Sequence, residues 1–411
     1  MTEWLDSPDG TAAVRDIGAA VDERREELVD LLGALIAEKS PNPPGDCSGV
    51  ARVLTEWLSR RGIACQAIEH VSIKPNLVST IEGSIGGRHL VLNGHMDTIG
   101  PGDVSAWTVP LHQMTRRDGK LYGLGSGNMK GALAALTLAY ASLHDMQTSL
   151  KGRVTYTAVA DETVFGPDGA GFLLDQRPDL CGDAVICGEG PGDMTLGIAE
   201  KGVLWAALEA NCPPGQGMLT TRGSSAIARL AHALTQIDAW NDEDVQPPAD
   251  IASVQTAAGA HRLRLSVNPG TITGGHFVSQ VASEATAEVD FRLPPGLTMK
   301  DMSVRLDALI ARHPSLRWRK IKGWDPNWTA ETSTIAKTVS AAAAKVRGRV
   351  PPPVVRLPAS DASRWRALGV PSICYGPQPE LASGIDDYVH EQDVVDCAKV
   401  YALSALAFLN A

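Results

Sequence analysis

The first hundred residues show a hydrophobic pattern that predicts helices followed by short strands. Between Val21 and Ala37 the leucines recur every three or four positions, which is the spacing of one helix face. A second helix is expected over residues 49–62. The apolar runs that follow are short and lie between turn-forming residues, so we expect strands at 64–68, 76–81 and 89–92.

The alternation of helix and strand continues through the next hundred residues. An Ala- and Leu-rich helix is expected over residues 129–143, followed by short apolar segments at 154–158, 170–174 and 184–187. This alternation is typical of an α/β fold with a mixed, mainly parallel sheet flanked by helices. Such sheets build their sites after the strand ends, and polar motifs stand there in this chain.

The alternation of helix and strand stops near Gly202 and resumes near Trp324. Between these points the hydrophobic pattern predicts an α+β insert, with strands at 203–209, 263–267 and 285–292 and an amphipathic helix at 224–235. Afterwards a helix, a strand and a last helix are expected at 332–346, 372–375 and 393–409. We therefore expect one catalytic α/β domain formed by residues 1–201 and 324–411, interrupted by an inserted domain at 202–323.

Length and composition agree with a two-domain protein that acts on small molecules. The chain has 411 residues, more than a single hydrophobic core usually organises. Its 37 basic and 47 acidic residues give a net charge of -10 without a long basic block, so a nucleic-acid or membrane partner is not expected. No segment resembles a signal peptide or membrane span, and we expect a cytoplasmic location.

The cysteines indicate neither a disulfide framework nor a thiolate metal site. Their number is odd, and none are spaced as Cys-x-x-Cys. The seven are Cys47, Cys65, Cys181, Cys187, Cys212, Cys374 and Cys397.

Five polar motifs that follow predicted strands carry the candidate chemistry. They contain His95 with Asp97, Asn128, Asp161 with Glu162, Glu189, and His390. Imidazole and carboxylate groups without a thiolate suit a hydrolytic divalent ion such as zinc, manganese or cobalt. A lone His at a strand end is more often a hydrogen-bonded structural residue, so the combination of motifs carries the prediction.

In order and spacing, these motifs resemble the zinc-dependent aminoacylase, acetylornithine deacetylase, succinyl-diaminopimelate desuccinylase and glutamate carboxypeptidase family. The resemblance covers nearly the whole chain and implies a metallopeptidase-type sheet with an inserted lid that pairs chains into dimers or larger assemblies. It implies that His95 and Glu189 bind metal, that Asp97 orients His95, and that Glu162 is the general base. His390 matches a ligand of the family's second metal.

Two positions depart from the family pattern. Asn128 stands where the family has a bridging Asp, and Thr163 stands where it has the second acid of a pair. An amide oxygen is neutral and a hydroxyl is a weak ligand, so the second metal site lacks two negative charges that the family pattern provides. We expect one labile ion per chain, held by His95, Glu189 and Asn128, with His390 free to bind substrate. The alternative is a family member that has lost catalysis and serves as a binding protein.

The lid segment also departs from the pattern, because residues 211–217 contain no His to stabilise an oxyanion. His276 could take this role, although it could equally be a surface residue. Arg292 matches a family Arg that binds a substrate carboxylate, with a structural salt bridge as the alternative. Ser360 and Gly376 lie in loops that line the family's pocket.

These residues predict a metal-dependent hydrolase that cleaves a C–N bond of a small carboxylate-bearing substrate. The missing lid His and second metal favour hydrolytic deamination of an aromatic amine, as in conversion of 5-nitroanthranilate to 5-nitrosalicylate and ammonia. The alternative is hydrolysis of an N-acyl amino acid amide.

Overall fold

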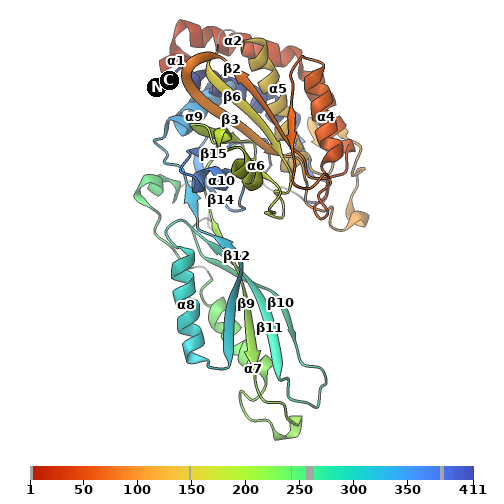
Figure 1. Cartoon of the computed structure of the whole chain (residues 1–411), viewed down its shortest axis with the longest axis vertical. Helices are drawn as coiled ribbons and strands as arrows, with labels where there is room; N and C mark the ends of the chain where they lie inside the picture. Colours follow the sequence, from red (N-terminus) through yellow and green to blue (C-terminus); the bar gives the residue numbers. More distant parts are fainter. Residues whose placement is uncertain (1–2, 148–149, 242, 256–262, 380–383) are drawn as a thin grey trace. The chain divides into compact units, whose positions relative to one another are not determined.

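The computed structural model describes residues 3–147, 150–241, 243–255, 263–379 and 384–411 (Figure 1). It divides into two compact units. The first unit comprises residues 1–198, 328–354 and 360–411, and the second comprises residues 199–327 and 355–359. The sequence analysis assigned the short segment 355–359 to the catalytic domain, whereas its contacts place it with the inserted one.

A nine-stranded sheet forms the centre of the first unit, with strand order β1-β2-β6-β3-β7-β15-β8-β13 and β14 paired to β8. Strands β6, β3, β7 and β15 run parallel to one another, whereas β2 is antiparallel to β6 and β8 is antiparallel to β15. The strands are β1 (Gln66–Ile68), β2 (Asn76–Glu82), β3 (Ser84–His95), β6 (Lys151–Val159), β7 (Ala184–Cys187), β8 (Leu196–Glu200), β13 (Asn327–Trp328), β14 (Pro353–Arg356) and β15 (Ser372–Cys374).

Helices pack on both faces of this sheet (Figure 1). One face is covered by α5 and α11, against which other helices pack, and the opposite face by α6 and α10. The helices are α1 (Glu3–Asp6), α2 (Pro8–Glu23), α3 (Arg25–Ala37), α4 (Ser48–Ser59), α5 (Gly131–Asp145), α6 (Ala170–Gln176), α9 (Thr334–Arg347), α10 (Ala362–Ala367) and α11 (Glu391–Leu409). The predicted α/β class with a mainly parallel, flanked sheet is confirmed.

A small antiparallel sheet completes the first unit. Its strand order is β16-β5-β4, formed by Tyr388–His390, Lys120–Tyr122 and Thr115–Arg117. Among the described residues, none of the helices combines the length and apolar content needed to cross a membrane.

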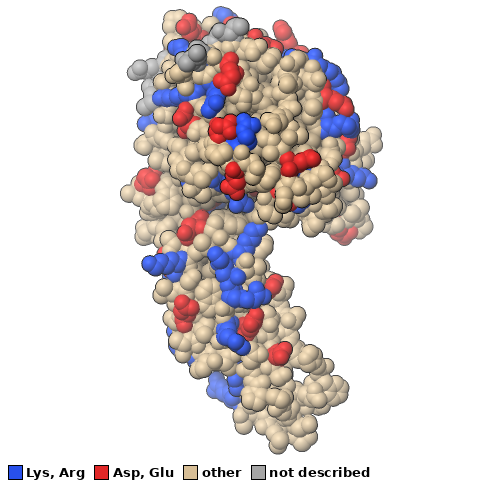
Figure 2. Space-filling model, in the orientation of Figure 1, with Lys and Arg blue, Asp and Glu red and all other residues tan. Residues whose placement is uncertain are grey.

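The second unit is a four-stranded antiparallel sheet, β10-β11-β9-β12, with two helices. The strands are β9 (Gly202–Asn211), β10 (Ser266–Gly274), β11 (Glu284–Leu293) and β12 (Leu316–Trp324), and the helices are α7 (Ala226–Asp238) and α8 (Met299–Arg312). Both helices pack on the sheet through a core that includes Leu208, Leu230, Phe291, Leu306 and Leu309. Basic side chains gather over β12 (Figure 2).

Candidate active site

Three neighbouring parallel strands bring the principal polar residues together. His95 is the last residue of β3, Glu162 follows the end of β6 by three residues, and Glu189 follows the end of β7 by two. In the parallel register His95 pairs with Val159 of β6, and Asn93 pairs with Cys187 of β7. The carboxyl ends of these strands therefore meet at one edge of the sheet, which is where doubly wound folds place their sites.

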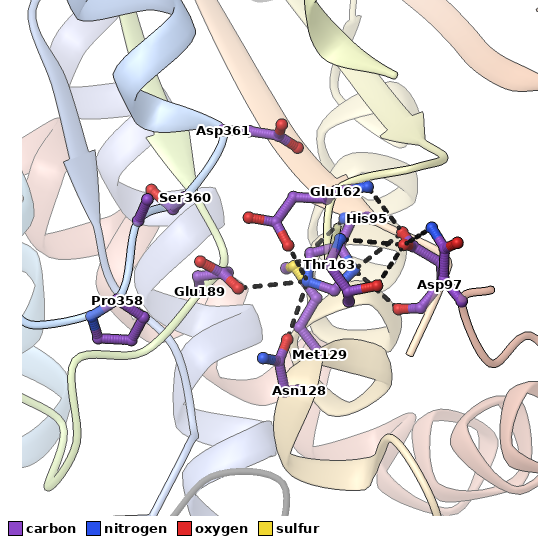
Figure 3. A network of polar contacts seen from close by, with 12 residues as sticks. His95, Asp97, Asn128, Met129, Glu162, Thr163, Glu189, Pro358, Ser360 and Asp361 are labelled. Carbon is purple, nitrogen blue, oxygen red and sulfur yellow. Dashed lines mark hydrogen bonds and ion pairs between the residues drawn. The ribbon is translucent and has the colours of Figure 1, made fainter. Parts of the chain in front are cut away.

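His95 lies at the centre of a cluster of oxygen atoms (Figure 3). Its Nε2 is 2.8 Å from Asn128 Oδ1, 3.2 Å from Glu189 Oε1 and 3.5 Å from Glu162 Oε2. Ligand atoms of His95, Glu162 and Glu189 all lie within 4.8 Å of one another, and all three residues are buried. The sequence analysis expected His95, Asn128 and Glu189 to bind the metal and Glu162 to act beside them as the general base.

Asn128 reaches the cluster from the helical turn Ser126–Lys130, which precedes α5. The buried Asp387 carboxylate accepts hydrogen bonds from the backbone N–H groups of Gly125, at 2.9 Å, and Gly127, at 3.2 Å. Gly125 has a φ of 84°, a left-handed conformation that favours glycine. The turn is therefore fixed by a carboxylate distant in sequence, which the sequence analysis did not identify.

Asp97 supports both the histidine and the Glu162 turn. Its backbone carbonyl accepts a hydrogen bond from His95 Nδ1 at 2.9 Å, whereas its carboxylate Oδ1 is 3.5 Å from that nitrogen. The same carboxylate accepts hydrogen bonds from the backbone N–H groups of Glu162 and Thr163, at 3.1 and 3.0 Å, and from the Thr163 hydroxyl at 2.7 Å. Thr163 thus directs its hydroxyl to Asp97.

The cluster holds more acid than base. Burial alone would lower the pKa of His95, but Glu162, Asp97 and Glu189 raise it well above its usual value. Burial, together with the charge of Glu189, raises the pKa of Glu162 far above the usual carboxyl range. Burial also raises the pKa of Asp361 to about 6. A dication is the group that would offset this crowding of carboxylates around one imidazole.

The residues present fit a divalent metal ion. Glu162 Oε1 is buried and has no hydrogen-bond partner among the described residues, which is unusual for a carboxylate oxygen unless an ion or water occupies the space beside it. Two ligands on a tetrahedral zinc ion with bonds of ~2.1 Å lie roughly 3.4 Å apart. The 3.2 Å separation of His95 Nε2 from Glu189 Oε1 is close to that value, and the 2.8 Å separation from Asn128 Oδ1 is shorter.

Gly376 and Ser360 (Figure 3), which were predicted to line the pocket, lie near the Glu189 loop. Gly376 packs so tightly that a Cβ built there would lie 1.9 Å from the Gly188 carbonyl oxygen, so a side chain at this position would displace the loop. Ser360 is buried next to α10, and its hydroxyl lies 3.2 Å from the Cys374 sulfur. Beside it, Asp361 accepts a hydrogen bond from Asn93 at 3.3 Å.

His390 is not among the residues that the structure brings into the cluster. It is the exposed last residue of β16, paired with Lys120 of β5, and its ring stands edge-on to Tyr388 at 5.5 Å. A role in substrate binding stays a prediction for this residue.

The remaining candidates lie in the second unit. His276 is exposed on the loop after β10. Arg292 on β11 donates a hydrogen bond to Asp290 at 2.8 Å, so the salt bridge considered as the alternative is present. The same arginine lines a cavity of about 460 Å³ together with Lys201, Arg264 and Ser266. Burial, and secondarily the charge of Arg292, lowers the pKa of Lys201 to about 8.

Comparison with known proteins gives the family. The model for "Peptidase family M20/M25/M40" matches residues 91–407, and the chain belongs to this family. It is 27% identical over 387 residues to a succinyl-diaminopimelate desuccinylase of Stenotrophomonas maltophilia, covering 89% of this chain and 95% of the relative. It is 30% identical over 267 residues to an acetylornithine deacetylase of Proteus mirabilis, covering 63% and 64%.

Solved structures show the same fold. A metallo-carboxypeptidase from Sulfolobus solfataricus superposes with a TM-score of 0.73 at 16% identity, covering 94% of this chain and 99% of the other. A dinuclear metal-binding peptidase from Bacillus subtilis gives a TM-score of 0.66 at 13% identity, covering 95% and 99%. The chain is a metal-dependent hydrolase of this family, which acts on C–N bonds.

Proposed function

We propose that this chain hydrolyses the amide bond of a small N-acylated, carboxylate-bearing amine. The observation that carries the proposal is the convergence of Asn128, Glu162 and Glu189 on His95 Nε2. A divalent ion held by His95, Glu189 and Asn128 supplies an acidified water and a Lewis acid for the amide carbonyl. With a single carboxylate among these three ligands, we expect one labile ion per chain.

Glu162 is the general base in this proposal. Its buried carboxylate faces His95 and retains one oxygen without a partner among the described residues. It takes a proton from the attacking water and delivers it to the leaving nitrogen.

We further propose that Arg292 binds the substrate carboxylate, because it matches an arginine of the family pattern and a guanidinium recognises a carboxylate in a bidentate manner. His276 remains a proposed hydrogen-bond donor to the substrate.

Amide hydrolysis replaces deamination as the favoured reaction. The relatives are named for removing succinyl and acetyl groups, and nothing in the comparisons supports conversion of 5-nitroanthranilate. Deamination was favoured because the lid His and the second metal are both missing. These two features affect how charge is stabilised, but they do not determine which nitrogen leaves.

We also propose that two chains pair through β10. This strand is an edge of its sheet, its residues 268–274 are exposed, and it carries no charged residue. The opposite edge, β12, contains Arg317, Arg319, Lys320 and Lys322, whose like charges oppose pairing with a second copy of that edge. An exposed, uncharged edge can pair with its own copy about a two-fold axis.

The experiment measures release of free amine and free acid from N-acetylornithine and N-succinyl-diaminopimelate with zinc or manganese added. We expect turnover of at least one compound, and we expect Glu162→Gln to reduce it by roughly 10²–10⁴-fold. Glu82→Gln, at a side chain that is 70% exposed, is the matched control and should retain activity. Ammonia released without an acid, or full activity of Glu162→Gln, would contradict the proposal.

A further inference from the structure

A partly buried ion pair lies next to the Glu162 turn and takes no part in the reaction proposed above. Lys74 Nζ is 2.7 Å from Asp161 Oδ1 and 3.2 Å from Asp168 Oδ2. The Asp161 side chain is fully buried, and that of Lys74 is 16% exposed. Asp161 directly precedes Glu162, so this contact adjoins the proposed general base.

The backbone at Asp161 adopts a conformation that needs support. Its φ is 60°, in the left-handed region that non-glycine residues seldom occupy. The Asp161 carbonyl accepts a hydrogen bond from the Gly166 N–H at 2.9 Å, and its carboxylate accepts one from the Asp168 N–H at 3.2 Å. These contacts and Lys74 hold residue 161, and thereby set the direction in which the chain presents Glu162.

A single amide joins Asp161 to the cluster. Asn42 Nδ2 donates to Asp161 Oδ1 at 3.0 Å and to Asp97 Oδ2 at 2.9 Å. Asp97 in turn accepts from the N–H groups of Glu162 and Thr163 and, through its backbone carbonyl, from His95. A continuous path of hydrogen bonds therefore runs from Lys74 to the predicted metal ligand.

The charges along this path explain why a lysine is needed. Asp97 and Asp161 are two buried carboxylates that share one amide donor. Lys74 is the cation that contacts Asp161. Without it, the Asp161 charge would be left buried and repelled by its neighbours, and the turn would relax to expose it.

We propose that Lys74 is a positioning residue for the metal cluster. By neutralising Asp161 it keeps the 161–163 turn in the conformation that presents Glu162 and anchors Asp97 beneath His95. This inference rests on the proposed function, because it assumes that the cluster binds a divalent ion. Supporting groups of this kind typically change metal affinity by ~10–100-fold when they are removed.

The test measures zinc binding to the full chain by isothermal titration, with thermal unfolding of each variant recorded alongside. We expect Lys74→Met to weaken zinc binding by ~10–100-fold and Lys74→Arg to stay within about threefold of the wild type. The double variant Lys74→Met/Asp161→Asn should recover most of the lost affinity, because it removes both charges and because Asn tolerates the left-handed conformation. Lys151→Met, at an exposed position, is the matched control.

The outcomes separate this inference from the proposed function. If the wild type binds no zinc or manganese, the proposed function fails. If the wild type binds zinc and Lys74→Met binds it equally well, or if the double variant recovers nothing, the role of Lys74 is refuted while the proposed function stands. Should Lys74→Met fail to fold, the double variant decides: binding within about tenfold of the wild type supports neutralisation, and weaker binding overturns it.

Discussion

At the scale of single residues, Asn128 and Thr163 distinguish this site from the pattern it resembles. The Asn128 oxygen is 2.8 Å from His95 Nε2, and an amide oxygen carries no charge. The Thr163 hydroxyl is directed to Asp97 at 2.7 Å. Both residues favour a single, weakly held ion, because each is a neutral group at a position where the family pattern has a carboxylate.

The first prediction follows from the missing charge at residue 128. Replacing the amide by a carboxylate in Asn128→Asp should tighten zinc binding by about tenfold or more, since affinity rises with the charge of the ligands. Isothermal titration measures the affinity, and metal analysis measures the number of ions per chain. Asn211→Asp, at an exposed position outside the first unit, should change neither. Unchanged affinity in Asn128→Asp would mean that residue 128 does not contact the ion.

Sequence reasoning identified the residues whose roles depend on strand ends. His95, Glu162 and Glu189 each follow a predicted strand, and parallel strands bring their carboxyl ends together. It did not identify Lys74, Asn42 or Asp387, because nothing in their local sequence indicates which distant carboxylate or backbone group each one contacts.

At the scale of elements, most strands of the central sheet were predicted, but β8, β13 and β14 were not. The predicted strand at 89–92 lies inside β3, which extends from Ser84 to His95. Helix α8 and strand β12 were not predicted, although α8 begins with a capping box formed by Thr298 and Asp301. The expected strand at 263–267 begins instead at Ser266.

The predicted helix over residues 21–37 is in fact the end of one helix and the whole of the next. The helical conformation is interrupted at Arg24, which has a φ of -101° and a ψ of 17°, so α2 ends at Glu23 and α3 begins at Arg25. Helical periodicity continued across this break because both helices bury leucine, valine or isoleucine at similar spacing. Periodicity alone does not detect a single non-helical residue.

The second prediction concerns His89, a buried residue of β3. Burial lowers its pKa to about 4, and the nearby charge of Arg153 adds to this effect. Between pH ~6.5 and ~4 the unfolded chain takes up a proton that the folded chain does not, so stability due to His89 is lost as the pH falls through this window. In His89→Gln the loss over this range should be smaller than in the wild type.

Thermal unfolding at several pH values between 7 and 4 measures this difference directly. His276→Gln, where the ring is exposed, serves as the control and should follow the wild type at every pH. Parallel curves for the wild type and His89→Gln would show that folding does not lower the pKa of His89.

At the scale of the whole molecule, an antiparallel unit is inserted into an α/β unit, and each has its own core. The insertion was visible in the sequence, because the helix and strand alternation stops near Gly202 and returns near Trp324. The return of residues 355–359 to the second unit was not visible, because the segment is too short to carry a pattern of its own.

The third prediction follows from the two edges of the second unit's sheet. We expect light scattering to give twice the chain mass of 43.4 kDa. Ile272→Lys, which puts a charge on β10 at a side chain 56% exposed, should shift the protein toward the monomer because like charges would face each other. Ile321→Lys, on β12 and 40% exposed, should leave the mass unchanged. A monomeric wild type would contradict pairing through β10.

The sequence by itself determined the α/β class, the existence of the insert, and the set of imidazole, carboxylate and amide groups that meet at the strand ends. These properties depend on local periodicity and on which residues follow each strand, and both can be read from residues that are neighbours in the sequence. Only the tertiary structure decided that Thr163 contacts Asp97, that His390 is exposed on β16, and that Lys74 contacts Asp161. Those facts depend on side-chain directions and on contacts between distant segments, which packing sets after the elements have formed.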